Sequence, residues 1–166
     1  MAYVYALLDS RKPGKFSYKN FSFDYEPFYI GLSTVADKYY SRMRDHLKVA
    51  VESNEMHPRL SKIRKMLNEG FKPIMIVVED NLEKSQAAKL EIALISAFGR
   101  SCTGEGPLTN LSSGGEAGAA GCKFPNRSPL SAETKAKIAG TLQKYWKDNP
   151  EIRSEEHTSE LQSHHP

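Results

Sequence analysis

The sequence is poor in cysteine and has neither a long apolar run nor a basic N-terminus, and each absence excludes a class of protein. Its two cysteines, Cys102 and Cys122, lack CxxC spacing, so neither a zinc knuckle nor a disulfide framework is indicated, and we expect reduced thiols. No apolar run approaches the roughly 18 residues that span a membrane. The N-terminal MAYVYALLDS lacks the basic region and the cleavage site of a signal peptide. We therefore expect a soluble, cytoplasmic protein.

Size, hydrophobic content and charge bound the fold and the partners. With 166 residues, 39% of them hydrophobic, the chain has room for one domain and a short appendage. The net charge of +3 hides an asymmetry, because residues 151–166 carry four acids and one arginine. The rest of the chain holds 22 basic and 16 acidic side chains, a surplus of six. A surplus of this size fits nucleic-acid binding without requiring it.

The C-terminal stretch Arg153–His164, RSEEHTSELQSH, resembles the in-frame translation of a widely used DNA sequencing adapter. We expect residues 151–166 to be a non-native tail that takes no part in the fold or the function. On this interpretation the native reading frame is interrupted near Ile152. An ordinary disordered polar tail leads to the same expectation.

Apolar and aromatic periodicity predicts three strands that alternate with helices. The expected strands are 2–8, 28–31 and 72–80, and the expected helices are 36–51, 57–69, 83–98 and 131–148. Turn-forming residues at 9–15, DSRKPGK, should end the first strand, and the aromatic segment 16–27 should form a hairpin around Lys19-Asn20. Residues 99–126 hold seven of the 11 glycines and predict an extended loop.

Glu91 is the strongest anomaly in the predicted helix 83–98. Its neighbours three, four and seven residues away are all apolar: Ala87, Ala88, Leu94, Ile95 and Phe98. A carboxylate in the middle of an apolar face is costly to bury alone, so it should be paired, protonated or bound to a metal. The alternatives are a basic partner across the core or a side chain that bends out to solvent.

Arg42 and His46 lie four residues apart in a predicted helix, so they share a face just after the second strand. They form either part of a site above the strand's end or the polar flank of an amphipathic helix. Tyr5 and Tyr29 lie within the first two strands, where half-buried packing is a tyrosine's ordinary role. Neither pair identifies a function alone.

Asn110 precedes a glycine-rich run in the stretch LTNLSSGGEAGAAG. Glycine-rich loops can bind phosphates, but this one lacks the spacing GxxxxGK[ST] and a strand-to-helix context. The sequence therefore does not indicate a nucleotide-binding loop.

Taken in chain order, YVYAL, FYIG, the Arg42 and His46 pair, Glu91 and LTNLSSGGE resemble the GIY-YIG nuclease family. The resemblance covers about residues 3–115, and five short motifs in the expected order are specific where one would not be. Tyr3 replaces the glycine of the first motif, a departure that concerns strand-edge packing more than chemistry. The second motif, at residues 29–31, is unaltered, and the segment between the two motifs is longer than is usual in the family.

The resemblance implies an α+β fold, in which a small three-stranded antiparallel β-sheet is flanked by α-helices, with the catalytic domain at residues 1–115. It implies a divalent-metal-dependent endonuclease of the homing type, which hydrolyses double-stranded DNA in a bacterial or phage-infected cell. The residues and the resemblance leave the oligomeric state open. A catalytically idle DNA-binding protein on the same fold is the main alternative, and a repair or restriction nuclease is a third possibility.

The resemblance also implies a role for each candidate side chain. Glu91 would hold a single Mg²⁺ or Mn²⁺ ion, and Arg42 would stabilise charge on the scissile phosphate. Tyr5 would position or deprotonate the attacking water, with Tyr29 or His46 assisting the proton transfer. A further residue, Asn110, would orient the site. All six positions carry competent side chains, which favours an enzyme over an idle binding protein.

Residues 116–150 are expected to combine a glycine-rich linker with a basic helical DNA-binding motif. The stretch SPLSAETKAKIAGTLQKYW resembles the motif that follows such nuclease domains in homing endonucleases. The candidate DNA contacts are its basic side chains and those just before it: Lys123, Arg127, Lys135, Lys137 and Lys144. The alternative is a helix that packs on the domain through Ile138, Leu142 and Trp146.

Overall fold

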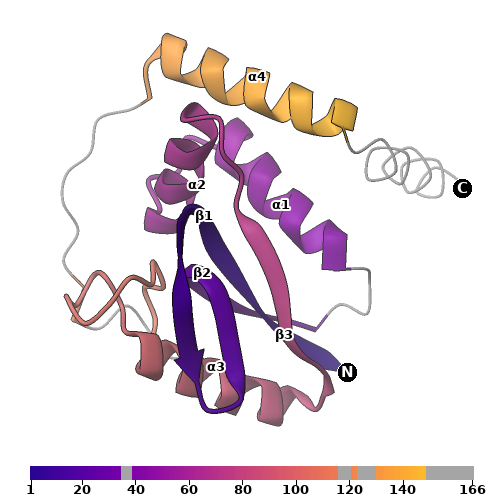
Figure 1. The fold of residues 1–166 in the computed structure, drawn as a ribbon, viewed down its shortest axis with the longest axis vertical. Helices are drawn as coiled ribbons and strands as arrows, with labels where there is room; N and C mark the ends of the chain where they lie inside the picture. The colour runs from indigo at the N-terminus through magenta and orange to yellow at the C-terminus, as the bar shows by residue number, and fades with distance from the viewer. Residues whose placement is uncertain (35–38, 116–120, 123–129, 149–166) are drawn as a thin grey trace, which may run out of the picture.

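The computed structural model describes residues 1–34, 39–115, 121–122 and 130–148. Its elements are β1 (Ala2–Tyr18), β2 (Phe21–Ser33), α1 (Tyr39–Glu52), α2 (Pro58–Asn68), β3 (Ile74–Leu82), α3 (Lys84–Phe98) and α4 (Ala132–Asp148) (Figure 1). The predicted α+β class is confirmed, and the helices within the described residues lie where periodicity placed them. Across the described part of the chain, no helix is both long and apolar enough to cross a bilayer.

The sheet has the order β2-β1-β3, and both pairs of strands are antiparallel, as predicted. Because β1 lies in the centre, Tyr3 is not at a sheet edge. It is buried, with its ring centroid 6.0 Å from that of Tyr5. The expectation that Tyr3 affects strand-edge packing is therefore wrong: the side chain that replaces the motif's glycine packs in the core.

The first two strands form one long hairpin, which corrects the prediction of a turn at residues 9–15. Pairing continues past Asp9, through Pro13 opposite Tyr25 and Phe16 opposite Phe23, with register shifts on either side of Pro13. Such irregularities let a strand accommodate a proline that cannot donate to its ladder. The chain reverses at 19–20, where Lys19 has a φ of 50°, as the aromatic pattern predicted.

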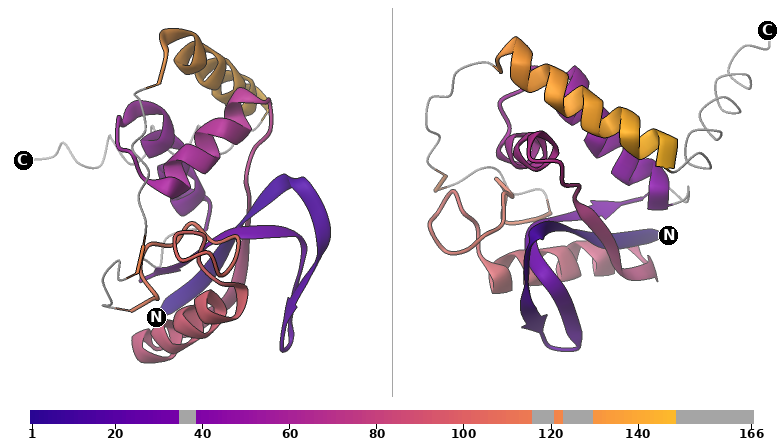
Figure 2. Two further views of the ribbon diagram at one scale, coloured as in Figure 1. Left: turned by 90° about the vertical axis from the view of Figure 1, so that its left-hand side faces the viewer. Right: turned by 45° about the horizontal axis from the view of Figure 1, so that its top comes forward.

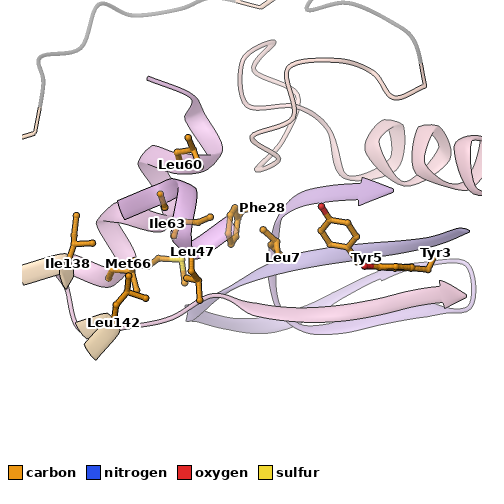
Figure 3. Close-up of a cluster of buried hydrophobic side chains, with 12 residues drawn as sticks. Tyr3, Tyr5, Leu7, Phe28, Leu47, Leu60, Ile63, Met66, Ile138 and Leu142 are labelled. Atoms are coloured by element: carbon orange, nitrogen blue, oxygen red, sulfur yellow. The ribbon is translucent and has the colours of Figure 1, made fainter. Parts of the chain in front are cut away.

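The two faces of the sheet carry different layers, as Figures 1 and 2 show. Alternation along β1 sends Tyr5 and Leu7 toward α1 and α2, with α4 stacked beyond them. The same alternation sends Val4 and Ala6 toward α3 on the opposite face. Figure 3 shows the first of these clusters, in which side chains of the sheet, α2 and α4 meet.

Helix α4 packs on the domain through its apolar side, as the alternative interpretation of this segment required. Ile138 and Leu142 are buried in the same cluster as Met66 and Leu67 of α2 (Figure 3). Trp146 is partly buried against that cluster. The basic side chains of α4 therefore lie on a helix whose position is fixed by the core.

Cys102 and Cys122 form a disulfide, with an S–S distance of 2.11 Å, so the expectation of reduced thiols is wrong. The loop after α3 folds back until their Cα atoms are 4.6 Å apart, although 20 residues separate them in sequence. Spacing alone cannot reveal such an approach. The Cys122 Sγ also lies 3.2 Å from the Leu111 carbonyl oxygen, beside the segment that carries Asn110.

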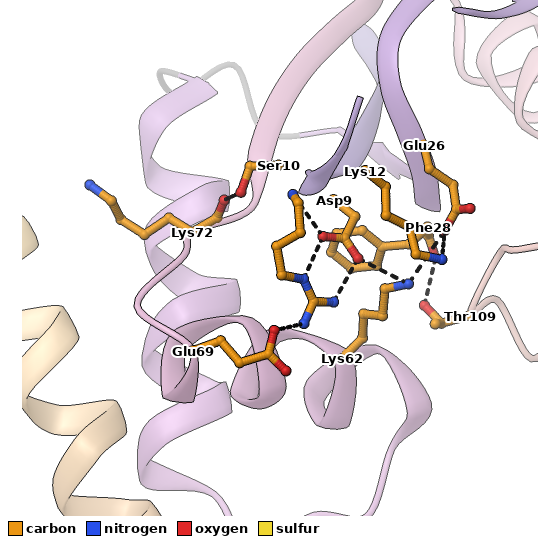
Figure 4. Close-up of polar contacts among 10 residues, drawn as sticks. Asp9, Ser10, Lys12, Glu26, Phe28, Lys62, Glu69, Lys72 and Thr109 are labelled. Carbon is orange, nitrogen blue, oxygen red and sulfur yellow. Dashed lines mark hydrogen bonds and ion pairs between the residues drawn. The ribbon is translucent and has the colours of Figure 1, made fainter. Parts of the chain in front are cut away.

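A buried carboxylate joins the hairpin to α2 (Figure 4). Asp9 is fully buried and accepts hydrogen bonds from Arg11 Nε at 2.8 Å and Nη2 at 2.7 Å. Lys62 Nζ of α2 lies 3.2 Å from the same carboxylate, and Arg11 also pairs with Glu69 at 2.6 Å. Burial would raise the pKa of Asp9, but the hydrogen bonds from Arg11 and Lys62 lower it to about 2. β1 thus carries a cluster in which each charged side chain is paired with one of opposite sign.

Candidate active site

The hydroxyl of Tyr5 is the centre of a polar cluster on the face of the sheet that α1 covers. Its Oη lies 2.7 Å from His46 Nε2, and Arg42 Nε donates to it at 3.2 Å. Arg42 and His46 therefore share a helix face because both reach Tyr5, and they do not form a solvated flank. Tyr5 is fully buried and His46 is 3% exposed, so these bonds form largely out of water.

Gly31 makes room for this cluster on the neighbouring strand. It pairs with Tyr5 across the sheet, and a Cβ atom at this position would lie 2.5 Å from the Tyr5 Cζ and Oη. The Tyr29 ring packs beside it, with its centroid 6.2 Å from the Tyr5 ring and 5.7 Å from the His46 ring. The Tyr-Ile-Gly motif thus requires glycine at this position, because a side chain would clash with both tyrosine rings.

Burial and two cations set the protonation states around Tyr5. Burial, followed by the charges of Arg59 and Arg42, lowers the pKa of His46 to about 3. Burial and the neighbouring Tyr29 raise the pKa of Tyr5 above its usual value, although Arg42 and Arg59 oppose the shift. At neutral pH the imidazole is neutral and the phenol protonated. The Tyr5 hydroxyl can then donate to His46 while it accepts from Arg42.

Asn110 holds the outer edge of β2. Its Oδ1 accepts from the Ile30 N–H at 3.0 Å, and its Nδ2 donates to the Ile30 carbonyl at 2.7 Å. The adjacent Thr109 donates from its backbone N–H and its hydroxyl to the Phe28 carbonyl, at 2.6 and 2.7 Å. The side-chain amide therefore takes the place of a neighbouring strand and fixes the backbone between Tyr29 and Gly31.

Glu91 belongs to α3, on the opposite face of the sheet from His46. It lies among the buried residues Ala87, Leu94 and Ile95 of this helix, as its spacing predicted, but its own side chain is only partly buried. The carboxylate is partly exposed and accepts a hydrogen bond from the Gly115 N–H at 3.2 Å. Burial raises its pKa, and the Gly115 bond partly offsets that rise.

A pocket of about 500 Å³ opens beside the Glu91 carboxylate, and it is lined by Leu32, Lys84, Ser85, Ala88, Glu91 and Gly115. Among the described residues, no three His, Cys, Asp or Glu side chains form a group that could hold a metal ion. A divalent ion here would therefore have one protein carboxylate. Mg²⁺ is commonly held in this way, by one or two carboxylates with water and substrate phosphate completing its shell.

Five of the six candidate residues thus form one connected group around Tyr5, and Glu91 lies apart from it. Tyr5 contacts Tyr29, Arg42 and His46, and Tyr29 also packs against His46. Asn110 joins this group through the backbone of Ile30. Glu91 is connected through the loop, because its partner Gly115 lies five residues after Asn110. Loop 108–115 therefore links the two faces of the sheet at the β2 edge.

Arg59 is a side chain that the sequence interpretation missed. It lies in the first turn of α2, with its guanidinium carbon 4.8 Å from the centroid of the Tyr29 ring. Its Nε is buried and has no hydrogen-bond partner among the described residues. The segment HPRL looks like an ordinary helix start in the sequence, with His57 as the N-cap, so only the fold connects Arg59 with Tyr29.

The candidate DNA contacts lie away from this cluster or outside the described residues. Lys135, Lys137 and Lys144 are exposed on α4, where Lys137 pairs with Glu133 at 3.1 Å. Lys123 and Arg127 fall outside the described residues. A DNA-binding role for all five residues stays a prediction.

Comparison with known proteins identifies a family whose match includes the same motifs. A family model for the LEM-3-like GIY-YIG domain matches residues 2–127, more than half of the chain, and ends before α4. No curated protein and no solved structure gives a significant match. The expected domain limits at residues 115 and 150 stay predictions. The family match spans the tyrosine motifs, the Arg42 and His46 helix, Glu91 and Asn110, and the chain therefore belongs to the GIY-YIG family, with a domain of the LEM-3-like type.

Proposed function

We propose that the protein is a divalent-metal-dependent endonuclease that hydrolyses phosphodiester bonds in double-stranded DNA. Membership of the GIY-YIG family supports a nuclease-type function, and with it a nucleic-acid substrate. The observation that carries the proposal is the cluster around Tyr5, where Arg42 binds a phenol poised against a neutral imidazole. That arrangement suits proton removal from water beside a bound phosphate.

Arg42 is the candidate for contact with the scissile phosphate. Its Nε is directed to Tyr5, and the guanidinium has further N–H groups that suit phosphate oxygens. Negative charge that accumulates on those oxygens during hydrolysis would be stabilised in a largely buried environment. Among the described residues, no carboxylate forms an ion pair with Arg42 that would compete for this role.

Tyr5 and His46 provide a path for the proton of the attacking water. The phenol's raised pKa disfavours a free phenolate, so Tyr5 would pass its own proton to His46 Nε2 as it accepts one from water. The charges of Arg42 and Arg59 weaken His46 as a base in the free protein. A bound phosphate would offset these charges and raise the pKa of the imidazole.

Glu91 is the candidate ligand for the metal ion. The partly exposed carboxylate beside a pocket of about 500 Å³ fits a Mg²⁺ or Mn²⁺ ion that takes its other ligands from water and substrate. When bound, such an ion would stabilise charge on phosphate and leaving-group oxygens. The Gly115 N–H would hold the carboxylate in place.

The homing type is a finer prediction that rests on the resemblance of the α4 segment to a DNA-binding motif. The family match is to a LEM-3-like domain and does not include α4, so it points to a different branch of the family. We accordingly restrict the proposal to endonuclease activity, with an idle DNA-binding protein as the alternative outcome.

Plasmid nicking by the full chain, in Mg²⁺, Mn²⁺ and EDTA, tests this function. We expect metal-dependent cutting that Glu91→Gln abolishes while DNA binding persists, because this change removes the ligand and leaves the basic contacts. Glu52→Gln, an exposed acid of α1, is the matched control and should cut normally. Unchanged cutting by Glu91→Gln would remove the metal assignment. Salt-sensitive DNA binding without cutting would support the idle protein.

A further inference from the structure

Arg59 lies at the edge of the Tyr5 cluster, against the Tyr29 ring. Its guanidinium lies over the Tyr29 ring, at a distance within the usual range of a cation–π contact. Its backbone N–H is fixed as well, because it donates to His57 Nδ1 at 3.1 Å at the start of α2. The helix cap therefore fixes the backbone of Arg59, and the Tyr29 ring is the contact of its side chain.

The charge of Arg59 is not matched within the described part of the protein. No described carboxylate forms an ion pair with it, and its buried Nε has no hydrogen-bond partner there. A buried donor without a partner is costly, and such groups are uncommon in folded proteins. The position thus favours a ligand that supplies both negative charge and acceptor oxygens.

Two guanidinium groups thus lie at the Tyr5 cluster, each in contact with a different tyrosine. Arg42 donates to Tyr5, and Arg59 covers Tyr29, whose ring packs edge-on against His46. Both cations act electrostatically on Tyr5 and on His46. Asp45 acts on Arg42 electrostatically, but no described carboxylate forms an ion pair with either arginine. Two such cations suit an anion with more than one charge, such as consecutive phosphates of one strand.

We infer that Arg59 is a second phosphate-binding residue of this site and holds a DNA phosphate next to the one that Arg42 contacts. The inference rests on the proposed function, because its ligand is the backbone of the nucleic-acid substrate. The contact with Tyr29 limits the freedom of the guanidinium before a ligand binds, so less side-chain entropy would be lost when the phosphate binds. Arg59 would thereby fix the strand that Arg42 and Tyr5 act upon.

The salt dependence of DNA binding tests this inference separately from cleavage. The full chain is titrated in EDTA with a short fluorescein-labelled duplex at several NaCl concentrations, with Arg59→Gln, Arg59→Lys and Lys65→Gln alongside the wild type. Lys65 is the matched control, because it is exposed on the same helix six residues later and on another face. Circular dichroism confirms that each variant is folded.

We expect Arg59→Gln to weaken binding about tenfold and to reduce the slope of log K against log salt by about 0.9, the value for one lost phosphate contact. Arg59→Lys should restore the slope but only part of the affinity, since it keeps the charge and loses the planar fork. Lys65→Gln should match the wild type. These three results together would support the inference.

Failure of the inference differs from failure of the proposed function. If the wild type binds DNA and Arg59→Gln keeps the wild-type slope, Arg59 contacts no phosphate, and any loss of cleavage would come from the position of Tyr29. If Arg59→Gln does not fold, Arg59→Lys decides, because a wild-type affinity would then contradict a role for the guanidinium fork. A wild type that neither binds nor cuts DNA would overturn the proposed function itself.

Discussion

Two clusters of polar side chains lie along β1, and α2 supplies a cation to each of them. Lys62 lies 3.2 Å from Asp9, whereas Arg59, one turn earlier, lies over Tyr29 beside Tyr5 and His46. In the Asp9 cluster, acids and bases are matched within the protein (Figure 4). In the Tyr5 cluster, two arginines have no ion-pair partner among the described residues.

Cations lower a pKa in both clusters, but they favour the ionised form of Asp9 and the neutral form of His46. Cations near Asp9 hold its carboxylate ionised and lower its pKa to about 2, although burial acts against this. Cations near His46 act together with burial and keep its imidazole neutral. The charges of the first cluster are paired within the protein, so we expect a structural role there, whereas the second cluster leaves positive charge available for an anion. Four predictions separate these roles, in order of decreasing expected effect.

The largest effect is expected from Asp9→Asn. This change leaves Arg11 and Lys62, which are 15% and 20% exposed, without their shared counter-charge. Loss of one partner from a buried ion pair costs about 3–5 kcal/mol. Urea unfolding followed by circular dichroism should show a loss of this size with an unchanged m-value. A loss below about 1 kcal/mol would mean that the matched cluster does not stabilise the fold.

Arg42→Ala should act on the reaction more than on stability. We expect the cleavage rate under saturating DNA to fall about 10²–10³-fold, the usual cost of removing one donor to a developing oxyanion. DNA affinity should fall much less. The control is Lys48→Ala, an exposed cation of α1. An equal loss of rate and affinity would make Arg42 a binding contact without a special role in the transition state.

Acid should destabilise the protein through His46. Between pH 6.5 and about 3 the unfolded state binds a proton at this residue and the folded state does not, so the free energy of unfolding falls as the pH is lowered. From pH 7 to pH 5 the contribution is about 2 kcal/mol, at 1.36 kcal/mol per pH unit. His46→Gln should lose that much less stability over the interval in parallel urea titrations. Identical pH dependence in both proteins would show that His46 is not held neutral.

The smallest effect is expected from Asp24→Asn at the tip of the hairpin. Asp24 pairs with Lys15, but their side chains are 72% and 80% exposed, so water screens the pair. The free energy of unfolding should change by less than about 0.5 kcal/mol. This variant makes the same chemical change as Asp9→Asn on the same hairpin. Comparable losses in the two variants would show that burial does not distinguish the clusters.

Much of the fold followed from patterns between close neighbours in the chain. The 3.6-residue period located the helices, and aromatic alternation located the chain reversal at Lys19-Asn20. The same reasoning failed for residues 9–15, where proline and glycine suggested a turn. There, cross-strand pairing and the buried Asp9 cluster hold the chain extended, and neither is visible from local composition.

The part of the candidate site that could be predicted is the part in which sequence spacing places side chains on one helix face. Four residues between Arg42 and His46 place both on one helix face, and both reach Tyr5. Spacing placed Glu91 among Ala87, Leu94 and Ile95, but it gave no sign that the carboxylate accepts from the Gly115 N–H of a loop distant in the chain. It also gave no sign of Arg59, whose neighbours come from a different strand.

By itself, the sequence determined the helices, the ordered motifs and the family, and it located the three strands without the full length of the first two. Each of these depends on residues a few positions apart or on their order. Tertiary structure alone decided the Cys102–Cys122 bond, the use of Asn110 as an edge for β2, and the contact between Arg59 and Tyr29. Each of these joins segments that are distant in the chain. Their approach is set by how the helices and the loop pack on the two faces of the sheet, and that packing has no local signature.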